Sequence, residues 1–151
     1  MTAYDQDVVA WANEQAQLLR SGQLSLIDIE HIAEEIEDVG KSEQRELANR
    51  MAALLAHLLK WEFQADHRGS SWETTIHTQR NSLQRRIRKS PSLKASLSDL
   101  DWRADAWDDA VDAASKETGI AYTNFPSACP WPQEQVMDQN FFPEHTASSG
   151  V

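Results

Sequence analysis

Five side chains on two neighbouring predicted helices have the chemistry to bind an anion or a small ligand. Folding the chain into a helical hairpin about Gly69 brings Glu62 and Arg80 close to the same level. Because buried charges must be paired, we expect an ion pair between these two side chains. The candidate polar pocket consists of His57, Trp61, Glu62, Gln79 and Arg80.

Two interpretations of this candidate pocket remain open. The network could serve only to fix the packing of the two helices, since an unpaired buried polar group costs about 1–3 kcal/mol. It could instead be a metal or small-ligand pocket with hydrolase-like chemistry. The sequence shows no Ser-His-Asp arrangement and no glycine-rich phosphate loop, so no catalytic residue is assigned. Lys60, beside the pocket, is expected to point to solvent.

An acidic run, "HIAEEIED", places His31 and Glu35 one helical turn apart. Carboxylates and histidines on bundle helices hold metals in di-iron proteins, but the order here is reversed and the motif occurs once. We therefore expect a solvent-exposed acidic face made by Glu34, Glu35 and Glu37, and we expect neither a metal nor a cofactor.

The single cysteine, Cys129, excludes a disulfide within the chain and a metal site made of cysteines. It has no basic residue beside it, so we expect an inert thiol. The net charge of −10 disfavours nucleic acid and anionic membranes as partners. Six basic residues lie between positions 74 and 98, so contact with nucleic acid through this segment stays open as a third interpretation. The chain shows no signal peptide and no apolar run long enough to span a membrane, which favours the cytoplasm.

The elements that would position these residues are all helical, because apolar residues recur at three- and four-residue spacing and no stretch alternates like a strand. We expect an all-α fold: an antiparallel bundle of four long helices, a fifth helix, and an extended C-terminal strap with one helical turn after Pro132. The expected helices span about 4–20, 25–40, 42–65, 70–90 and 100–118. Residues 1–143 would form a single domain and 144–151 a flexible tail.

Two helix faces are expected to be buried. Leu54 and Leu58 would lie in the core of the bundle. Gly40 would end the second helix, and the buried stripe of that helix would be Ile29, Ile32, Ala33, Ile36 and Val39.

The chain resembles the bacterial family catalogued as domain of unknown function 29. The pieces that carry the resemblance are "YDQDVVAWANEQAQLLRSG", "DIEHIAEEIEDVGKSEQRELANRMAALLAHLLKWEFQ", "SWETTIHTQRNSLQRRIRKSPSLK" and "FPSACPWPQEQVMD". The resemblance implies a small all-helical protein and supplies no catalytic residues. We therefore expect a noncatalytic interaction or regulatory protein that acts through a partner chain or by self-association, for example as a homodimer.

Overall fold

The computed structural model describes residues 1–144, and every element in that range is a helix. This confirms the predicted all-α class. The α-helices are α1 (Val8–Arg20), α2 (Ile29–Phe63), α3 (Ser70–Lys89), α4 (Lys94–Ser98), α5 (Leu100–Thr118) and α6 (Gln133–Met137). Short 3-10 helices are η1 (Leu24–Leu26), η2 (Ala65–His67), η3 (Pro91–Leu93) and η4 (Tyr122–Asn124). The predicted tail from residue 145 onward lies outside the described residues.

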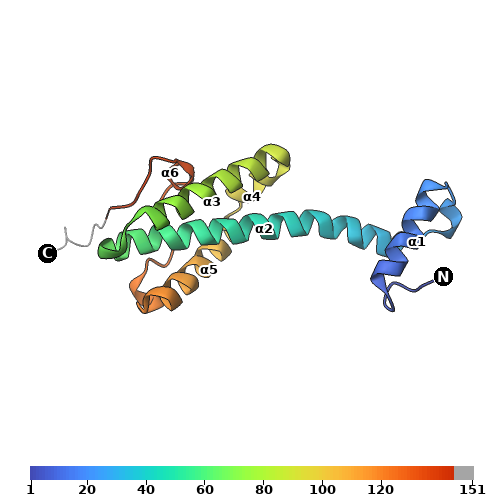
Figure 1. Ribbon diagram of the computed structural model, residues 1–151, viewed down its shortest axis with the longest axis horizontal. Helices are drawn as coiled ribbons and strands as arrows, with labels where there is room; N and C mark the ends of the chain where they lie inside the picture. The colour runs from blue at the N-terminus through green and yellow to red at the C-terminus, as the bar shows by residue number, and fades with distance from the viewer. Residues whose placement is uncertain (145–151) are drawn as a thin grey trace. The chain divides into compact units, whose positions relative to one another are not determined.

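The chain divides into two compact units, which Figure 1 shows with their helices labelled. The N-terminal unit is Met1–Ser42, and the C-terminal unit begins at Glu43. Folding as a single domain stays a prediction, which cooperative unfolding would test.

Helix α2 corrects the sequence analysis, because it runs without a break through Gly40. The predicted helices 25–40 and 42–65 are one helix, so the predicted helix end at Gly40 is wrong. The four long helices of the expected bundle are therefore not all separate. A glycine inside a helix costs only about 1 kcal/mol relative to alanine. Good helix formers on both sides of it, such as Glu37, Lys41 and Glu43, offset that cost. The helix begins after Asp28, whose side chain accepts a hydrogen bond from the backbone N–H of His31 at 3.3 Å.

The core of the C-terminal unit is built on residues 47–63 of α2. In Figure 1, α3 and α5 run beside this part of α2, one on either side. Leu54 and Leu58 are fully buried, as predicted, and pack with Ile76 and Leu83 of α3 and with the small residues of α5. The spacing of these apolar residues therefore located the core of this unit correctly.

Helix α5 spans the predicted residues 100–118, and its two ends show why. The Asp99 carboxylate accepts hydrogen bonds from the backbone N–H groups of Asp101 and Trp102, which caps the first turn. Gly119 adopts a left-handed conformation with φ of 77° and closes the last turn.

The C-terminal segment, residues 120–144, packs on the helices of its unit. Phe125, Trp131 and Val136 are buried in the core. The Trp107 indole of α5 donates a hydrogen bond to the carbonyl of Pro126 at 2.9 Å. The predicted helical turn after Pro132 is confirmed as α6.

Candidate functional site

Lys60 is buried, and the expectation that it points to solvent is wrong. Only 7% of the residue is exposed. Its ammonium group forms an ion pair with Glu117 of α5 and lies 5.4 Å from the ring centroid of Trp72. Nζ is also 3.4 Å from Nε2 of His57. Lys60 therefore joins three helices at one point in the C-terminal unit.

His57 belongs to this Lys60 cluster and turns its two ring nitrogens to different partners. Nδ1 lies 2.9 Å from the carbonyl of Ala53, so Nδ1–H donates and Nε2 is left to accept from Lys60. Burial lowers the pKa of His57 below its ordinary value, and the nearby Lys60 charge lowers it further. The neutral form is therefore favoured, which suits an acceptor for an ammonium group.

Arg80 is completely buried and is held by the C-terminal segment. Its Nε donates to the carbonyl of Val136 at 2.7 Å, and Nη2 donates to the carbonyl of Phe141 at 2.8 Å. The guanidinium lies 5.7 Å from the ring centroid of Phe142. Burial lowers the pKa of Arg80 below its usual value. Arg80 therefore holds residues 136–142 against α3 through these two hydrogen bonds.

The other members of the predicted pocket differ in their burial and in their contacts. Glu62 is buried, and Gln79 is half-buried. The Trp61 ring packs 4.8 Å from Phe142, so Trp61 and Arg80 contact the same phenylalanine. His57 lies within reach of Lys60. The Glu62–Arg80 ion pair stays a prediction. A ligand at these five residues stays a prediction.

The predicted acidic face is only partly a solvated face. Glu34 and Glu37 are exposed, as expected. Glu35 is half-buried and accepts a 2.5 Å hydrogen bond from the hydroxyl of Tyr4. This bond is the main reason that the pKa of Tyr4 rises to about 12, because it stabilises the protonated phenol. Glu35 thus ties the start of the chain to α2.

Asp28 and His31 form a second polar cluster in the N-terminal unit that the sequence analysis did not predict as a site. Nδ1 of His31 lies 2.7 Å from Asp28 Oδ2, which also accepts from the Trp11 indole at 3.0 Å. The Tyr4 ring stacks on His31 with centroids 4.2 Å apart. The Asp28 hydrogen bond raises the pKa of His31, and the same bond lowers the pKa of Asp28. The three-residue spacing of Asp28 and His31 could have predicted their pairing. Their aromatic neighbours are distant in sequence, so spacing could not have predicted those contacts.

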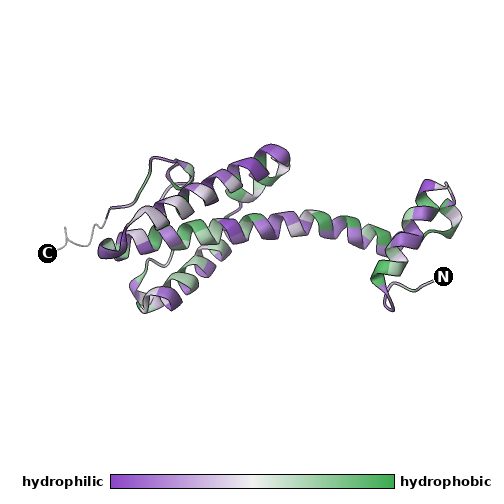
Figure 2. Cartoon of the chain, in the orientation of Figure 1, coloured by the Kyte–Doolittle hydropathy of each residue, from purple (hydrophilic) through white to green (hydrophobic). Residues whose placement is uncertain are grey.

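An apolar face of α2 in the N-terminal unit is exposed, which corrects the predicted buried stripe. Ile29 is 68% exposed, Ile36 is 67% and Val39 is 66%, while Ile32 is half-buried. We call these four residues the isoleucine face. Ala33, beside them, is exposed as well. Figure 2 shows apolar and polar positions alternating along this part of α2, as in a helix that buries one side.

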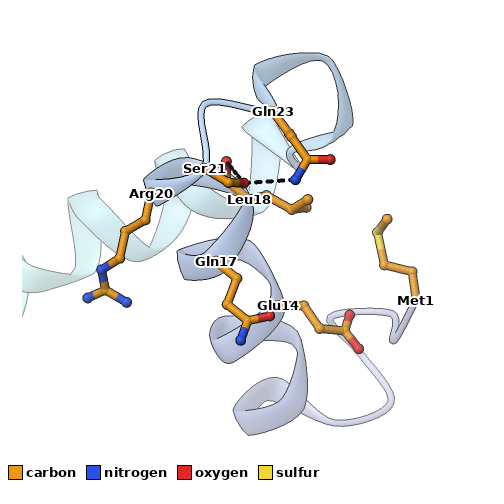
Figure 3. Close-up of a pocket in the computed structure, with 7 residues that line it drawn as sticks. All are labelled: Met1, Glu14, Gln17, Leu18, Arg20, Ser21 and Gln23. Atoms are coloured by element: carbon orange, nitrogen blue, oxygen red, sulfur yellow. Dashed lines mark hydrogen bonds between the residues drawn. The ribbon is translucent and has the colours of Figure 1, made fainter.

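An open depression of about 620 Å³ lies beside α1 in the N-terminal unit (Figure 3). It is lined by Met1, Glu14, Gln17, Leu18, Arg20, Ser21 and Gln23. The Glu14 carboxylate accepts hydrogen bonds from the backbone N–H and the hydroxyl of Thr2, so it holds the start of the chain. None of the residues predicted as a site lines this depression.

The remaining chemistry of the described residues is limited. Cys129 is half-buried and carries a free thiol that donates to the carbonyl of Trp131 at 3.5 Å; burial raises its pKa. Within residues 1–144, no three His, Cys, Asp or Glu side chains gather closely enough to hold a metal ion. No helix in that range is both long and apolar enough to cross a membrane.

Comparison with known proteins identifies the chain by family. No curated protein and no solved structure matches it. A family model described as Domain of unknown function DUF29 matches residues 3–142, nearly the whole chain, as the sequence pieces predicted. The chain therefore belongs to the DUF29 family.

Proposed function

We propose that this protein is a noncatalytic interaction module and that the isoleucine face is its binding surface. The observation that carries the proposal is the exposure of Ile29, Ile36 and Val39, each about two-thirds accessible, on one side of a regular helix. Large aliphatic residues repeated at helical spacing are normally turned towards a core.

The N-terminal unit has little core of its own to cover these residues. Its buried residues are Trp11 and Gln15. Most of the exposed large apolar residues between positions 1 and 144 belong to this unit: Met1, Val8, Val9, Leu19, Leu24, Leu26, Ile29, Ile36 and Val39. Of these, Ile29, Ile36 and Val39 share one face of α2, and contiguous exposed apolar patches are typical of surfaces that another chain covers.

The free energy available from covering the isoleucine face supports a specific contact. Complete burial of an aliphatic side chain contributes about 1.5–3 kcal/mol. Three side chains that are two-thirds exposed therefore offer on the order of 3–6 kcal/mol. Such a central apolar patch, surrounded by polar residues, resembles the core and rim of a protein–protein interface.

Photo-cross-linking in the native cell tests this proposal. We expect a cross-linking amino acid at position 36 to give a discrete adduct, because that side chain would lie in the interface. The matched control is position 100, since Leu100 of α5 is 75% exposed but lies in the other unit. Ile29→Asp should abolish the adduct at position 36. Identical adducts at both positions, or none at position 36, would refute the proposal.

A further inference from the structure

We propose that the occupant of the isoleucine face is a basic amphipathic helix presented by a different protein. This inference rests on the proposed function and adds the chemistry of the partner. It follows from the spacing of the face, from the charges beside it, and from what a second copy of the chain has to offer.

The spacing of the isoleucine face fits a helix. Ile29 and Ile36 lie seven residues apart, as do Ile32 and Val39, which is the pattern of two a/d pairs in a coiled coil. From end to end the face is about 15 Å long at a rise of about 1.5 Å per residue, or nearly three turns. Gly40 lies beside it with no atom within 4 Å of an added Cβ, so its edge is open to a partner.

The charges beside the face select a basic partner. Residues 1–42 contain nine Asp and Glu but only two Lys and Arg. Exposed carboxylates on residues 29–42 of α2 belong to Glu30, Glu34, Glu37 and Asp38. Two copies of this face packed together would oppose like charges, which disfavours association, whereas Lys and Arg side chains would complement it.

The basic helix of a second copy lacks the necessary apolar side. Arg85, Arg88 and Lys89 of α3 are exposed and supply charge. However, Ile76, Leu83 and Ile87, which form the apolar side of α3, are buried in the core of the C-terminal unit. A second copy thus offers basic charge without an apolar stripe, so the partner is another protein.

Binding of labelled synthetic peptides to the full-length protein tests the proposal. The first peptide carries four Leu or Ile at a/d spacing with Lys and Arg beside them. The second keeps the apolar stripe but has Glu in place of the basic residues. The third has the composition of the first, with its apolar residues scattered around the helix. Fluorescence anisotropy measures the dissociation constant for each.

We expect only the first peptide to bind, with a dissociation constant on the order of micromolar. Ile36→Asp should weaken its binding about tenfold or more, whereas Leu100→Asp should leave it unchanged. Glu34→Gln combined with Glu37→Gln should weaken it several-fold, and raising the salt from about 50 to 300 mM should do the same. Ile29→Asp provides a second variant of the face, and the thermal melts of all variants verify that they are folded.

Three results would overturn the proposal. The acidic or the scattered peptide could bind as tightly as the first, or the first could fail to bind. Light scattering could instead show a dimer that Ile36→Asp dissociates, which would make a second copy the occupant. In each case a specific cross-link from position 36 would still support the interaction module, so the failure of this inference is distinguishable from failure of the proposed function.

Discussion

At the scale of single residues, the buried charges of the C-terminal unit are held by groups far away in the sequence. Lys60 reaches Glu117 of α5, and Arg80 reaches the carbonyls of Val136 and Phe141. The two side chains differ in whether the partner group that remains after a substitution can be solvated by water. Glu117 is about half exposed and can be solvated by water, whereas Val136 is almost fully buried.

The contribution of Lys60 should come mainly from its aliphatic stem. Lys60→Met keeps the stem and removes the charge, so we expect the free energy of unfolding to change by less than about 1 kcal/mol. Lys60→Ala removes the packing as well and should cost about 2–3 kcal/mol. Urea denaturation measures both. A large loss in the methionine variant would show that the ion pair itself matters.

Arg80 should be far more sensitive. Arg80→Ala removes two hydrogen bonds from a charged donor, each contributing about 1.5–3 kcal/mol, so we expect a loss of about 3–6 kcal/mol in the free energy of unfolding. Limited proteolysis should then cleave residues 120–144 faster. Arg85→Ala, at an exposed position of the same helix, is the control and should change stability by less than about 0.5 kcal/mol. Equal effects would contradict the role assigned to Arg80.

The two histidines with shifted pKa values should give opposite pH dependences. The pKa of His31 is raised from 6.5, so its stabilising contribution is complete below that pH and is lost as the pH rises through the folded-state pKa. The pKa of His57 is lowered from 6.5, so its contribution is present above that pH and is lost as the pH falls through the folded-state pKa.

Urea midpoints between about pH 5 and 8 measure this difference. His31→Gln should reduce the loss of stability on the alkaline side, and His57→Gln should reduce the loss on the acid side. The same slope in both variants would mean that the environments of the two rings are wrongly assigned.

The sequence predicted which polar residues are buried more readily than it predicted their hydrogen-bond partners. Glu62 was correctly expected to be buried because it falls on an apolar helix face, and Arg80 because the hairpin about Gly69 brings it near Glu62. The acceptors of Arg80 are backbone carbonyls, which every residue carries, so no side-chain pattern reveals them. Tyr4 and Glu35 were missed as a pair for a related reason: the contact depends on how the start of the chain returns to α2.

At the scale of helices, the ends of α5 were predictable and the continuity of α2 was not. Asp99 and Gly119 have strong local reasons to start and stop a helix. Gly40 has a negative φ and open space around it, so nothing in its conformation requires glycine. The free-energy cost of glycine within a helix is small enough to be offset by the neighbouring residues.

Gly40→Ala tests the continuity of α2 directly. Alanine in a helix interior is about 0.5–1 kcal/mol more favourable than glycine, so we expect this substitution to stabilise the protein by about that amount. Thermal or urea unfolding measures the change. Destabilisation would indicate that residue 40 adopts the left-handed conformation of a helix end. Gly119→Ala, at a position with φ of 77°, is the contrasting control and should destabilise.

At the scale of the whole molecule, the two units differ in how much core they have. Leu47, Leu54 and Leu58 of the C-terminal unit are completely buried, whereas the N-terminal unit buries chiefly Trp11 and Gln15. Spacing alone could not reveal this difference. The isoleucine face has the same helical period as the leucines of residues 47–58, because the period shows that a face is apolar and not what covers it.

Hydrogen exchange should show this difference as local stability. Without a partner, we expect amides of α1 and of residues 32–42 in α2 to exchange through openings of lower free energy than those of residues 51–59. Mass spectrometry of exchanged peptides provides the measurement. Equal protection in both regions would contradict this expectation and show that the two units open together.

The alkylation rate of the free Cys129 thiol can report how often the C-terminal segment opens. The thiol is half-buried, its pKa is raised, and its hydrogen bond goes to Trp131 within the same segment. Alkylation needs an accessible thiolate, so iodoacetamide modifies Cys129 faster in molecules whose C-terminal segment has separated from the helices. Since the chain has no other cysteine, the mass of the intact protein reports the alkylation of Cys129 alone, and its rate follows the opening of the segment.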